Sequence, residues 1–445
     1  MAVKVGMITL GCAKNQVDGE LFMAKLKAAG YEPVDDVAMA DVAIVNTCGF
    51  IDSAKKESID EILELGLLKK EGRIKKLVAT GCLAERYQEE IRREIPELDG
   101  VLGIGANEDP AKYIAELLNG GPVEAFPEKS KLPLCGDREL TTPSWTAYLK
   151  IAEGCDNRCS YCAIPYIRGG YRSRTMEDIE QEARALMRNG AKELVLIAQD
   201  TTRYGIDLYG EYSLAKLLQR LCKLDGIKWL RVLYCYPDAI TDELLDVMAS
   251  EEKVVPYIDL PLQHCSGSVL RAMNRRGDRE SLEALISKIR DKVPGVILRT
   301  TLITGFPGET EEDFAELSSF VKKVKFDRLG CFTYSQEEGT PAAGLPGQLE
   351  QEEKERRAGI ITEQQMDISE EKGQALIGST LQVLVEGFDR YAECWFGRSY
   401  MDAPDVDGRI FFTVGEKRPT LGSFVPVKIE DCMEGDLMGS MELNI

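Results

Sequence analysis

Short apolar runs alternate with amphipathic stretches in two successive series, and this alternation limits the possible folds more than any other feature. The first series ends near residue 120, and its expected strands are residues 3–10, 41–46 and 76–80. The second has six expected strands, at residues 147–152, 194–199, 230–235, 256–260, 297–303 and 329–335. Such alternation builds parallel sheets with crossover helices. We predict an α/β fold: an open parallel N-terminal domain, then a partial (β/α)6 barrel with its active site at the carboxyl ends of the strands.

The rest of the chain divides by composition. Residues 121–143 are rich in Pro, Gly, Lys and Glu without periodicity, which predicts a linker. The charged run 348–372 predicts a solvated amphipathic helix, and the short alternating strands beyond residue 378 predict a small β-barrel. The expected domains are therefore residues 1–120, 144–372 and 373–445, with the linker between the first two.

Cysteine is unusually frequent and histidine is nearly absent. The 445 residues include 13 Cys and one His, His264, and the formal net charge is −20. No apolar run is long enough for a membrane span and the start does not read as a signal peptide, so we expect a soluble cytoplasmic protein. That compartment keeps thiols reduced, so structural disulfides cannot account for the cysteines. The single imidazole argues against His-based zinc sites, and for His264 a structural role is favoured over catalysis.

The strongest chemical motif is Cys155-Asp-Asn-Arg-Cys159-Ser-Tyr-Cys162, which directly follows the first strand of the second series. Three thiols in one loop can ligate one [4Fe–4S] cluster, which normally takes four thiolates, so one iron stays open for a substrate or cofactor. The alternatives are core thiols or half a zinc site. No later Cys pair has the spacing that would complete a zinc site.

Cys12, Cys48 and Cys82 share a position rather than a motif. Each lies just beyond the carboxyl end of an expected parallel strand. Because such strands end at one edge of the sheet, about 4.8 Å apart, the three thiols can meet in one crevice. They can hold a second cluster with one open iron, or they can be ordinary buried thiols at strand ends. Spacing alone leaves both readings open.

Two loops are candidates for binding a nucleoside cofactor. Gln199 and Asp200 follow the second strand of the second series, where they can hydrogen-bond a sugar or carboxylate, or simply form a βα loop. Gly305 and Glu309 lie in a Gly-rich turn that opens a helix at Thr310. That turn allows close backbone approach to a nucleoside, or is an ordinary left-handed turn with an N-cap.

These residues resemble a known family. The Cys-x3-Cys-x2-Cys loop is the motif of radical S-adenosylmethionine (SAM) enzymes, and the whole chain is similar to the radical-SAM methylthiotransferases, which end in a TRAM domain. The matching motifs are Gly11-Cys-Ala-Lys-Asn15, Asn46-Thr-Cys-Gly-Phe50, Thr80-Gly-Cys82, Glu153-Gly-Cys-Asp-Asn-Arg-Cys159 and Thr304-Gly-Phe-Pro-Gly-Glu-Thr310. Ala13 departs from the Pro of many relatives, but it adjoins a ligand position without replacing it.

Within that family the chain resembles the RimO branch, which modifies an aspartate of the small-subunit ribosomal protein uS12, rather than the branch that modifies tRNA adenosines. The motifs that look like RimO are Tyr257-Ile-Asp-Leu-Pro-Leu-Gln-His-Cys-Ser266, Asp327-Arg-Leu-Gly-Cys-Phe332 and Gly397-Arg-Ser-Tyr-Met-Asp-Ala-Pro-Asp-Val-Asp-Gly408. Charge supports this branch: residues 376–445 carry 12 acidic and six basic side chains, a net of −6. A tRNA-binding module is expected to be basic, whereas an acidic one suits a basic ribosomal protein or is merely soluble.

The resemblance implies two [4Fe–4S] clusters, one on Cys155, Cys159 and Cys162 and an auxiliary one on Cys12, Cys48 and Cys82. It implies SAM as methyl donor and as radical source, a methylthio group inserted at Cβ of the aspartate, and flavodoxin or ferredoxin as reductant. The expected partner is uS12 or the assembled small subunit, and direct tRNA binding is disfavoured. The alternatives are a tRNA adenosine methylthiotransferase and a non-catalytic iron–sulfur scaffold that binds the ribosome.

Overall fold

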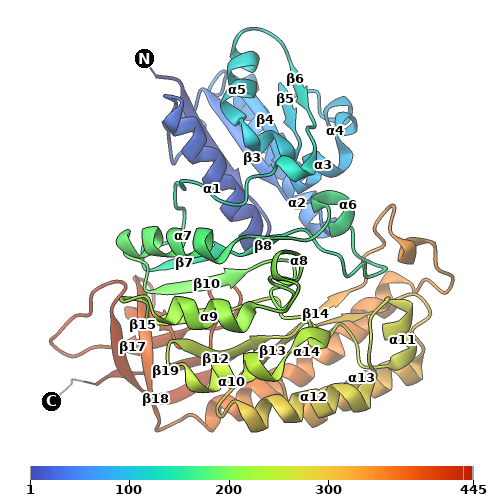
Figure 1. The fold of residues 1–445 in the computed structure, drawn as a ribbon, viewed down its shortest axis with the longest axis vertical. Coiled ribbons are helices and arrows are strands. Elements are labelled where there is room, and N and C mark those ends of the chain that lie inside the picture. Colours follow the sequence, from blue (N-terminus) through green and yellow to red (C-terminus); the bar gives the residue numbers. More distant parts are fainter. Residues whose placement is uncertain (1, 434, 443–445) are drawn as a thin grey trace.

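The computed structural model describes residues 2–433 and 435–442, and its N-terminal domain lies at one end of the molecule (Figure 1). This domain is a parallel sheet with the order β2-β1-β3-β4-β5-β6. Its strands are β1 (Lys4–Thr9), β2 (Glu32–Pro33), β3 (Val42–Thr47), β4 (Lys76–Gly81), β5 (Gly100–Leu102) and β6 (Val123–Ala125). Its helices are α1 (Ala13–Ala28), α2 (Asp52–Lys70), α3 (Cys82–Tyr87), α4 (Glu89–Glu94) and α5 (Pro110–Leu118).

The segment 121–143, expected as a linker, contributes the edge strand of this sheet. Strand β6 pairs with β5 in parallel over three residues. Both strands are too short for a periodic pattern, so neither stands out in the sequence. The same segment also returns to the N-terminal helix: Arg138 contacts Glu20 of α1 through two nitrogens, at 2.9 and 2.5 Å. It therefore packs as part of the fold.

The central domain is a six-stranded parallel sheet in chain order, β14-β13-β12-β11-β10-β7. Its strands are β7 (Thr146–Lys150), β10 (Glu193–Ile197), β11 (Trp229–Val232), β12 (Val254–Asp259), β13 (Ile297–Thr304) and β14 (Arg328–Thr333). Strands β7 and β14 remain edge strands, which confirms the partial (β/α)6 barrel predicted from six consecutive units. A two-stranded ribbon, β8 (Ala152–Glu153) with β9 (Arg172–Ser173), follows the first strand.

Helices cover the outer face of the central sheet. They are α7 (Met176–Arg188), α9 (Leu214–Cys222), α10 (Asp242–Ser250), α12 (Arg279–Lys292) and α13 (Glu311–Val324). The short helices α6 (Ile164–Arg168), α8 (Ile206–Tyr209) and α11 (Gly267–Ala272) lie in the segments that follow β8, β10 and β12, and α6 contacts α3 of the N-terminal domain. Short 3-10 turns occur at Val37–Met39, Ile104–Glu108, Lys129–Lys131, Pro237–Ala239 and Pro341–Gly344. The largest apolar core lies between this sheet and its helices.

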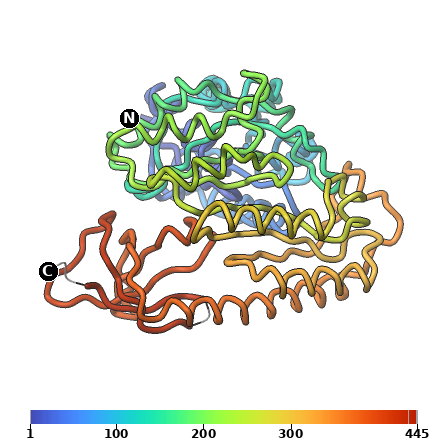
Figure 2. Tube along the Cα trace, turned by 60° about the horizontal axis from the view of Figure 1, so that its bottom comes forward, coloured from blue at the N-terminus to red at the C-terminus, as the bar shows by residue number. Residues whose placement is uncertain are grey.

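The last helix corrects one expectation. The charged run 348–372 forms α14 (Gln351–Gln374), but one of its faces is buried. Ile361 and Ile368 join the main core, and Arg357 binds Glu309 at 2.7 Å. The sequence pattern indicates a solvated helix because the buried face of α14 contains charged residues as well as apolar ones. Figure 2 shows α14 running along the central domain to the barrel. None of the described helices has the length and apolarity that crossing a bilayer requires.

The C-terminal domain is a closed five-stranded barrel, as predicted, with the order β15-β16-β17-β19-β18. Its strands are β15 (Thr380–Asp389), β16 (Cys394–Arg398), β17 (Ile410–Thr413), β18 (Phe424–Met433) and β19 (Asp436–Met441). Strands β16 and β19 were not foreseen. Each is short and contains glycine, which weakens a strand pattern.

A loop of this barrel, residues 399–409, inserts against the inner face of the central sheet; we call it the barrel loop. Its Met401 and Ala403 belong to one apolar cluster with Tyr148, Val195 and Tyr257 of the sheet. Three polar contacts also join the loop to the sheet: Asp402 with Arg328 (2.5 Å), Asp405 with the Tyr148 hydroxyl (3.2 Å) and Asp407 with the Tyr257 hydroxyl (2.6 Å). The barrel is thus anchored in the central domain.

Candidate functional site

Cys12, Cys48 and Cys82, which we call the N-terminal triad, lie at the carboxyl ends of three adjacent strands. Cys12 is the N-cap residue of α1, Cys48 directly follows β3, and Cys82 is the first residue of α3. Gly11 allows the loops of Cys12 and Cys48 to approach closely. Its φ is +88°, and a Cβ at this position would lie only 2.8 Å from the Cys48 sulfur. The strand ends therefore bring the three cysteines to one edge of the sheet.

Burial raises the pKa of the Cys82 thiol to about 12, Cys12 and Cys48 act in the same direction, and Arg168 opposes them. An Arg168 Nη2 atom donates a hydrogen bond to the Cys82 sulfur at 3.3 Å. A bound metal centre would deprotonate these thiols and reverse the electrostatics, because a thiolate is the ligand form. The site therefore already provides one charge-assisted donor for a thiolate at Cys82.

Cys155, Cys159 and Cys162, which we call the central triad, lie in one loop after β8. The Cys162 amide donates to the Cys159 carbonyl at 3.0 Å, which curls the loop upon itself. Burial raises the pKa of Cys155 to about 11, and the neighbouring Asp200 and Cys159 add to this effect. Arg275 approaches the Cys159 sulfur at 3.7 Å, and its guanidinium lies 4.3 Å from the centroid of the Tyr236 ring.

Gly154 permits the turn into the central triad. Its φ is +76°, and a Cβ at this position would lie 2.1 Å from the Gly170 carbonyl oxygen. We expect Gly154→Ala to displace the loop, because both the backbone and the contact oppose a side chain. The bound iron after anaerobic reconstitution should then fall by about half, since only one of the two triads is disturbed.

Gly72→Ala is the matched control for this experiment. Gly72 has a similar φ of +79°, but nothing lies within 4 Å of the added Cβ. Full iron content in Gly154→Ala would show that the loop tolerates the change. An equal iron loss in Gly72→Ala would show that backbone strain in general, and not this turn, is responsible.

A buried group of four charges connects the two triads. It consists of Asp18 from α1, Lys150 from β7, Glu153 from β8 and Arg168 from α6, each at most 2% exposed. Arg168 reaches Asp18 at 2.8 Å and Glu153 at 3.0 Å, and Lys150 reaches Glu153 at 2.9 Å and also contacts Asp18. The group is balanced in charge and crosses from the N-terminal to the central domain. We call it the charge quartet.

Gln199 and Asp200 border the central triad but differ in what they leave free. The Gln199 amide donates to Glu153 at 3.0 Å, while its Oε1 atom is buried without a partner among the described residues. Asp200 accepts hydrogen bonds from Asn157 of the cysteine loop at 2.8 Å and from the Thr202 hydroxyl at 2.6 Å. Gln199 thus retains a free acceptor atom, Oε1, whereas Asp200 stabilises the cysteine loop through its hydrogen bond with Asn157.

Gly305 and Glu309 form a turn whose polar groups are satisfied within the protein. The Glu309 carboxylate accepts from the Gly305 amide at 2.8 Å and from Arg357 at 2.7 Å. His264 lies 3.8 Å from the same carboxylate, and burial lowers the pKa of His264 to about 4. Its Nδ1 accepts from the Ser266 amide at 2.9 Å, and its Nε2 is buried without a hydrogen-bond partner among the described residues.

Both triads are suited to iron–sulfur clusters. All 13 cysteines are free, so no described thiol is consumed in a disulfide. Within the described ranges, no three His, Cys, Asp or Glu side chains are grouped as a single metal ion would need. A cluster has a different requirement, since its thiolates bind separate iron atoms. Each triad offers three thiols with an arginine beside one sulfur, which is the donor chemistry that such a cluster takes.

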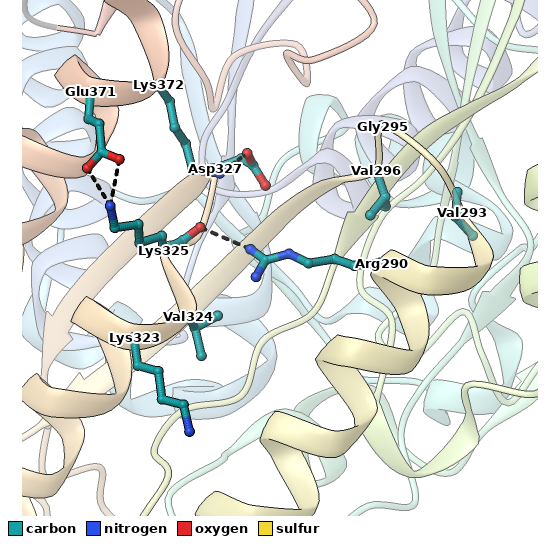
Figure 3. Close-up of a pocket in the computed structure, with 10 residues that line it drawn as sticks. All are labelled: Arg290, Val293, Gly295, Val296, Lys323, Val324, Lys325, Asp327, Glu371 and Lys372. Carbon is teal, nitrogen blue, oxygen red and sulfur yellow. Dashed lines mark hydrogen bonds and ion pairs between the residues drawn. The ribbon is translucent and has the colours of Figure 1, made fainter. Parts of the chain in front are cut away.

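A pocket elsewhere in the molecule lies between the ends of α12, α13 and α14 (Figure 3). It opens at the amino ends of β13 and β14, opposite to the cysteines. Its charged groups bind one another: Lys325 pairs with Glu371 at 2.5 Å, and Arg290 donates to the Lys325 carbonyl at 3.0 Å. Because ligands in such folds bind at the carboxyl ends of strands, this pocket is not a candidate site.

Comparison with known families divides the chain as the structure does. Residues 4–103 match the model described as "Uncharacterized protein family UPF0004", residues 149–321 match the Radical SAM superfamily, and residues 377–441 match the TRAM domain. Among solved structures, the radical SAM methyltransferase TsrM from Kitasatospora setae has a TM-score of 0.59 at 16% identity over 77% of each chain. At that identity the likeness shows the shared fold.

Curated relatives extend the match to the full length. The Thermoanaerobacter (strain X514) protein is 48% identical over 436 residues, covering 98% of this chain and 99% of the relative. The Clostridioides difficile (strain 630) protein is 47% identical over 444 residues, with 99% of each chain covered. Both are named ribosomal protein uS12 methylthiotransferase RimO. Together with the three matched domains, these relatives show that the chain belongs to the RimO family of radical-SAM methylthiotransferases.

Proposed function

We propose that this chain transfers a methylthio group to Cβ of an aspartate in ribosomal protein uS12, with SAM as both methyl donor and radical source. The observation that carries this function is the full-length identity of 46–49% to eight proteins named uS12 methylthiotransferase. The meeting of two thiol triads at one domain boundary supports it, because the reaction needs a site for radical formation and a site for sulfur.

We assign one [4Fe–4S] cluster to the central triad and an auxiliary cluster to the N-terminal triad. A cluster on the central triad would supply the electron that cleaves SAM, and each cluster would offer an open iron to a further ligand. The protein holds each thiolate at a fixed strand end or loop. Arg168 and Arg275 each place a guanidinium beside one sulfur, and the unused Gln199 Oε1 is available to a bound SAM.

The barrel favours a basic protein partner over tRNA. Asp402, Asp405 and Asp407 face the central sheet, and Arg398 is also buried against Glu193. The other charged residues of segment 376–445 still include more acids than bases. Phosphate binding calls for the opposite sign. The residues and the family therefore both support uS12 as the substrate, and a ribosomal substrate supports a cytoplasmic reaction. The resemblance to the family supports flavodoxin or ferredoxin as the electron donor.

The direct test uses protein reconstituted anaerobically with iron and sulfide. It is incubated with SAM, a strong reductant and either a peptide spanning the uS12 aspartate or unmodified tRNA, and both are analysed by mass spectrometry. We expect a methylthio mass increment on the peptide aspartate alone. An increment on tRNA adenosine would overturn the uS12 assignment. Absence of deoxyadenosine from protein that carries its full iron content would support the scaffold alternative.

A further inference from the structure

Lys14 is an exception among the buried cations. Nine lysines and arginines of the described chain are buried. Eight donate hydrogen bonds to carboxylates or backbone carbonyls, namely Lys150, Arg168, Arg174, Arg231, Arg275, Lys354, Arg357 and Arg398. Lys14 is only 7% exposed, yet no carboxylate of the described residues lies within 4.0 Å of its Nζ atom. Buried charges are normally paired with an anion, whereas the groups that favour the charge of Lys14 are Tyr234 and Cys12, and neither is a carboxylate.

The Lys14 side chain crosses the boundary between the two domains. It is the second residue of α1, and its Nζ atom lies 3.2 Å from the centroid of the Tyr234 ring. Tyr234 follows β11 at the carboxyl end of the central sheet. Its amide donates to Asp259 at 2.9 Å, and its carbonyl accepts from the Thr201 amide at 3.0 Å, so the backbone that carries the ring is held in place.

The aromatic ring compensates the charge only in part. A cation–π contact occupies one side of an ammonium and leaves N–H donors unused. Cys12 of the N-terminal triad is two residues before Lys14, and both lie at the positive end of the α1 dipole. An anion beside Cys12 would therefore meet a lysine and a helix N-terminus together.

We propose that the Lys14 ammonium binds the side-chain carboxylate of the aspartate that is modified. Cβ is one bond from that carboxylate, so an ion pair at Lys14 holds the reacting carbon close to a fixed point between the triads. The pair also selects aspartate over asparagine, because a neutral amide would leave the ammonium buried without an anion. This inference rests on the proposed function and names the residue that recognises its substrate.

Binding of fluorescent peptides tests the proposal without turnover. The probes are a labelled peptide spanning the uS12 aspartate and the same peptide with asparagine at that position, titrated anaerobically into reconstituted protein. We expect the unmodified protein to bind the aspartate peptide about tenfold more tightly, and Lys14→Met to bind both peptides alike. Lys14→Arg should restore part of the preference, and Lys14→Met should keep its iron content and its affinity for SAM.

Lys27→Met is the matched control, because it removes the same charge from the exposed far end of α1. A preference retained in Lys14→Met would overturn the proposal. Loss of iron with the preference intact would make Lys14 a counter-ion of the N-terminal triad, and weaker SAM binding alone would make it a cofactor ligand. Methylthio transfer to the aspartate peptide by the unmodified protein is measured separately, so failure of the proposed function is distinguished from failure of this inference.

Discussion

Alanine in place of any thiol of the central triad is expected to abolish formation of deoxyadenosine, whereas alanine in the N-terminal triad should abolish only methylthio transfer. The reason is structural. The two triads belong to different sheets, so removing a thiol from one leaves the three thiols of the other in place. Reconstituted protein should carry roughly eight iron atoms, and each variant roughly four, as two clusters of four imply.

The measurement combines iron and sulfide analysis with chromatography of deoxyadenosine and mass spectrometry of the peptide. Cys135→Ala is the control, because Cys135 is exposed and belongs to neither triad. Retained iron in all six variants would contradict the assignment of the ligands. Loss of deoxyadenosine in the N-terminal variants with four iron atoms still bound would show that the two sites do not act separately.

Arg168→Met is expected to lower the free energy of unfolding by about 3–5 kcal/mol, the usual cost of removing one partner from a buried ion group. Among the described residues, Asp18 and Glu153 would then share Lys150 as their only cation. Arg168 and Lys150 overcome burial and hold the pKa of Glu153 well below its ordinary range. The contribution of Glu153 is therefore present at neutral pH and lost only when the pH falls below the usual carboxylate range.

Anaerobic urea denaturation at pH 7 measures this effect. Arg172→Met is the control, because Arg172 is near in the chain but binds only backbone carbonyls. The double variant Arg168→Met with Asp18→Asn should lose less stability than the sum of the single variants, since it removes a charge of each sign. Additive losses, or a loss below 1 kcal/mol in Arg168→Met, would contradict the role of the charge quartet.

The sequence predicts the sheets and the cysteine positions for the same reason. Buried parallel strands are continuous apolar runs, so the six central strands can be recognised in the sequence. Strands of one parallel sheet also end at one edge, so Cys12, Cys48 and Cys82 can be assigned to one place. The strands β5 and β6 are missed because three residues carry too little pattern, and β16 and β19 are missed because each contains a glycine, which weakens a strand pattern.

The sequence does not predict the polar part of the site. Asp18 and Lys150 are 132 residues apart, and Asp18 and Arg168 are 150 apart. Such residues look like ordinary surface charges until two domains dock and bury them. Lys14 cannot be recognised in the sequence for the same reason, because what distinguishes it is that no carboxylate of the described residues lies near its ammonium. The motif around Cys12 includes Lys14, but a motif does not reveal which of its charges is buried.

The barrel loop has a consequence for how such a protein can be recombined. Asp402 is the carboxylate that pairs with Arg328, so exchanging the barrel for an unrelated one would leave that arginine without its anion. A transplanted barrel must therefore bring a loop with carboxylates at matching positions, or the receiving sheet must lose its arginines. We therefore expect the two domains to be inherited as a pair. A chimera joined only at the domain border would combine a loop and a sheet whose charges do not match.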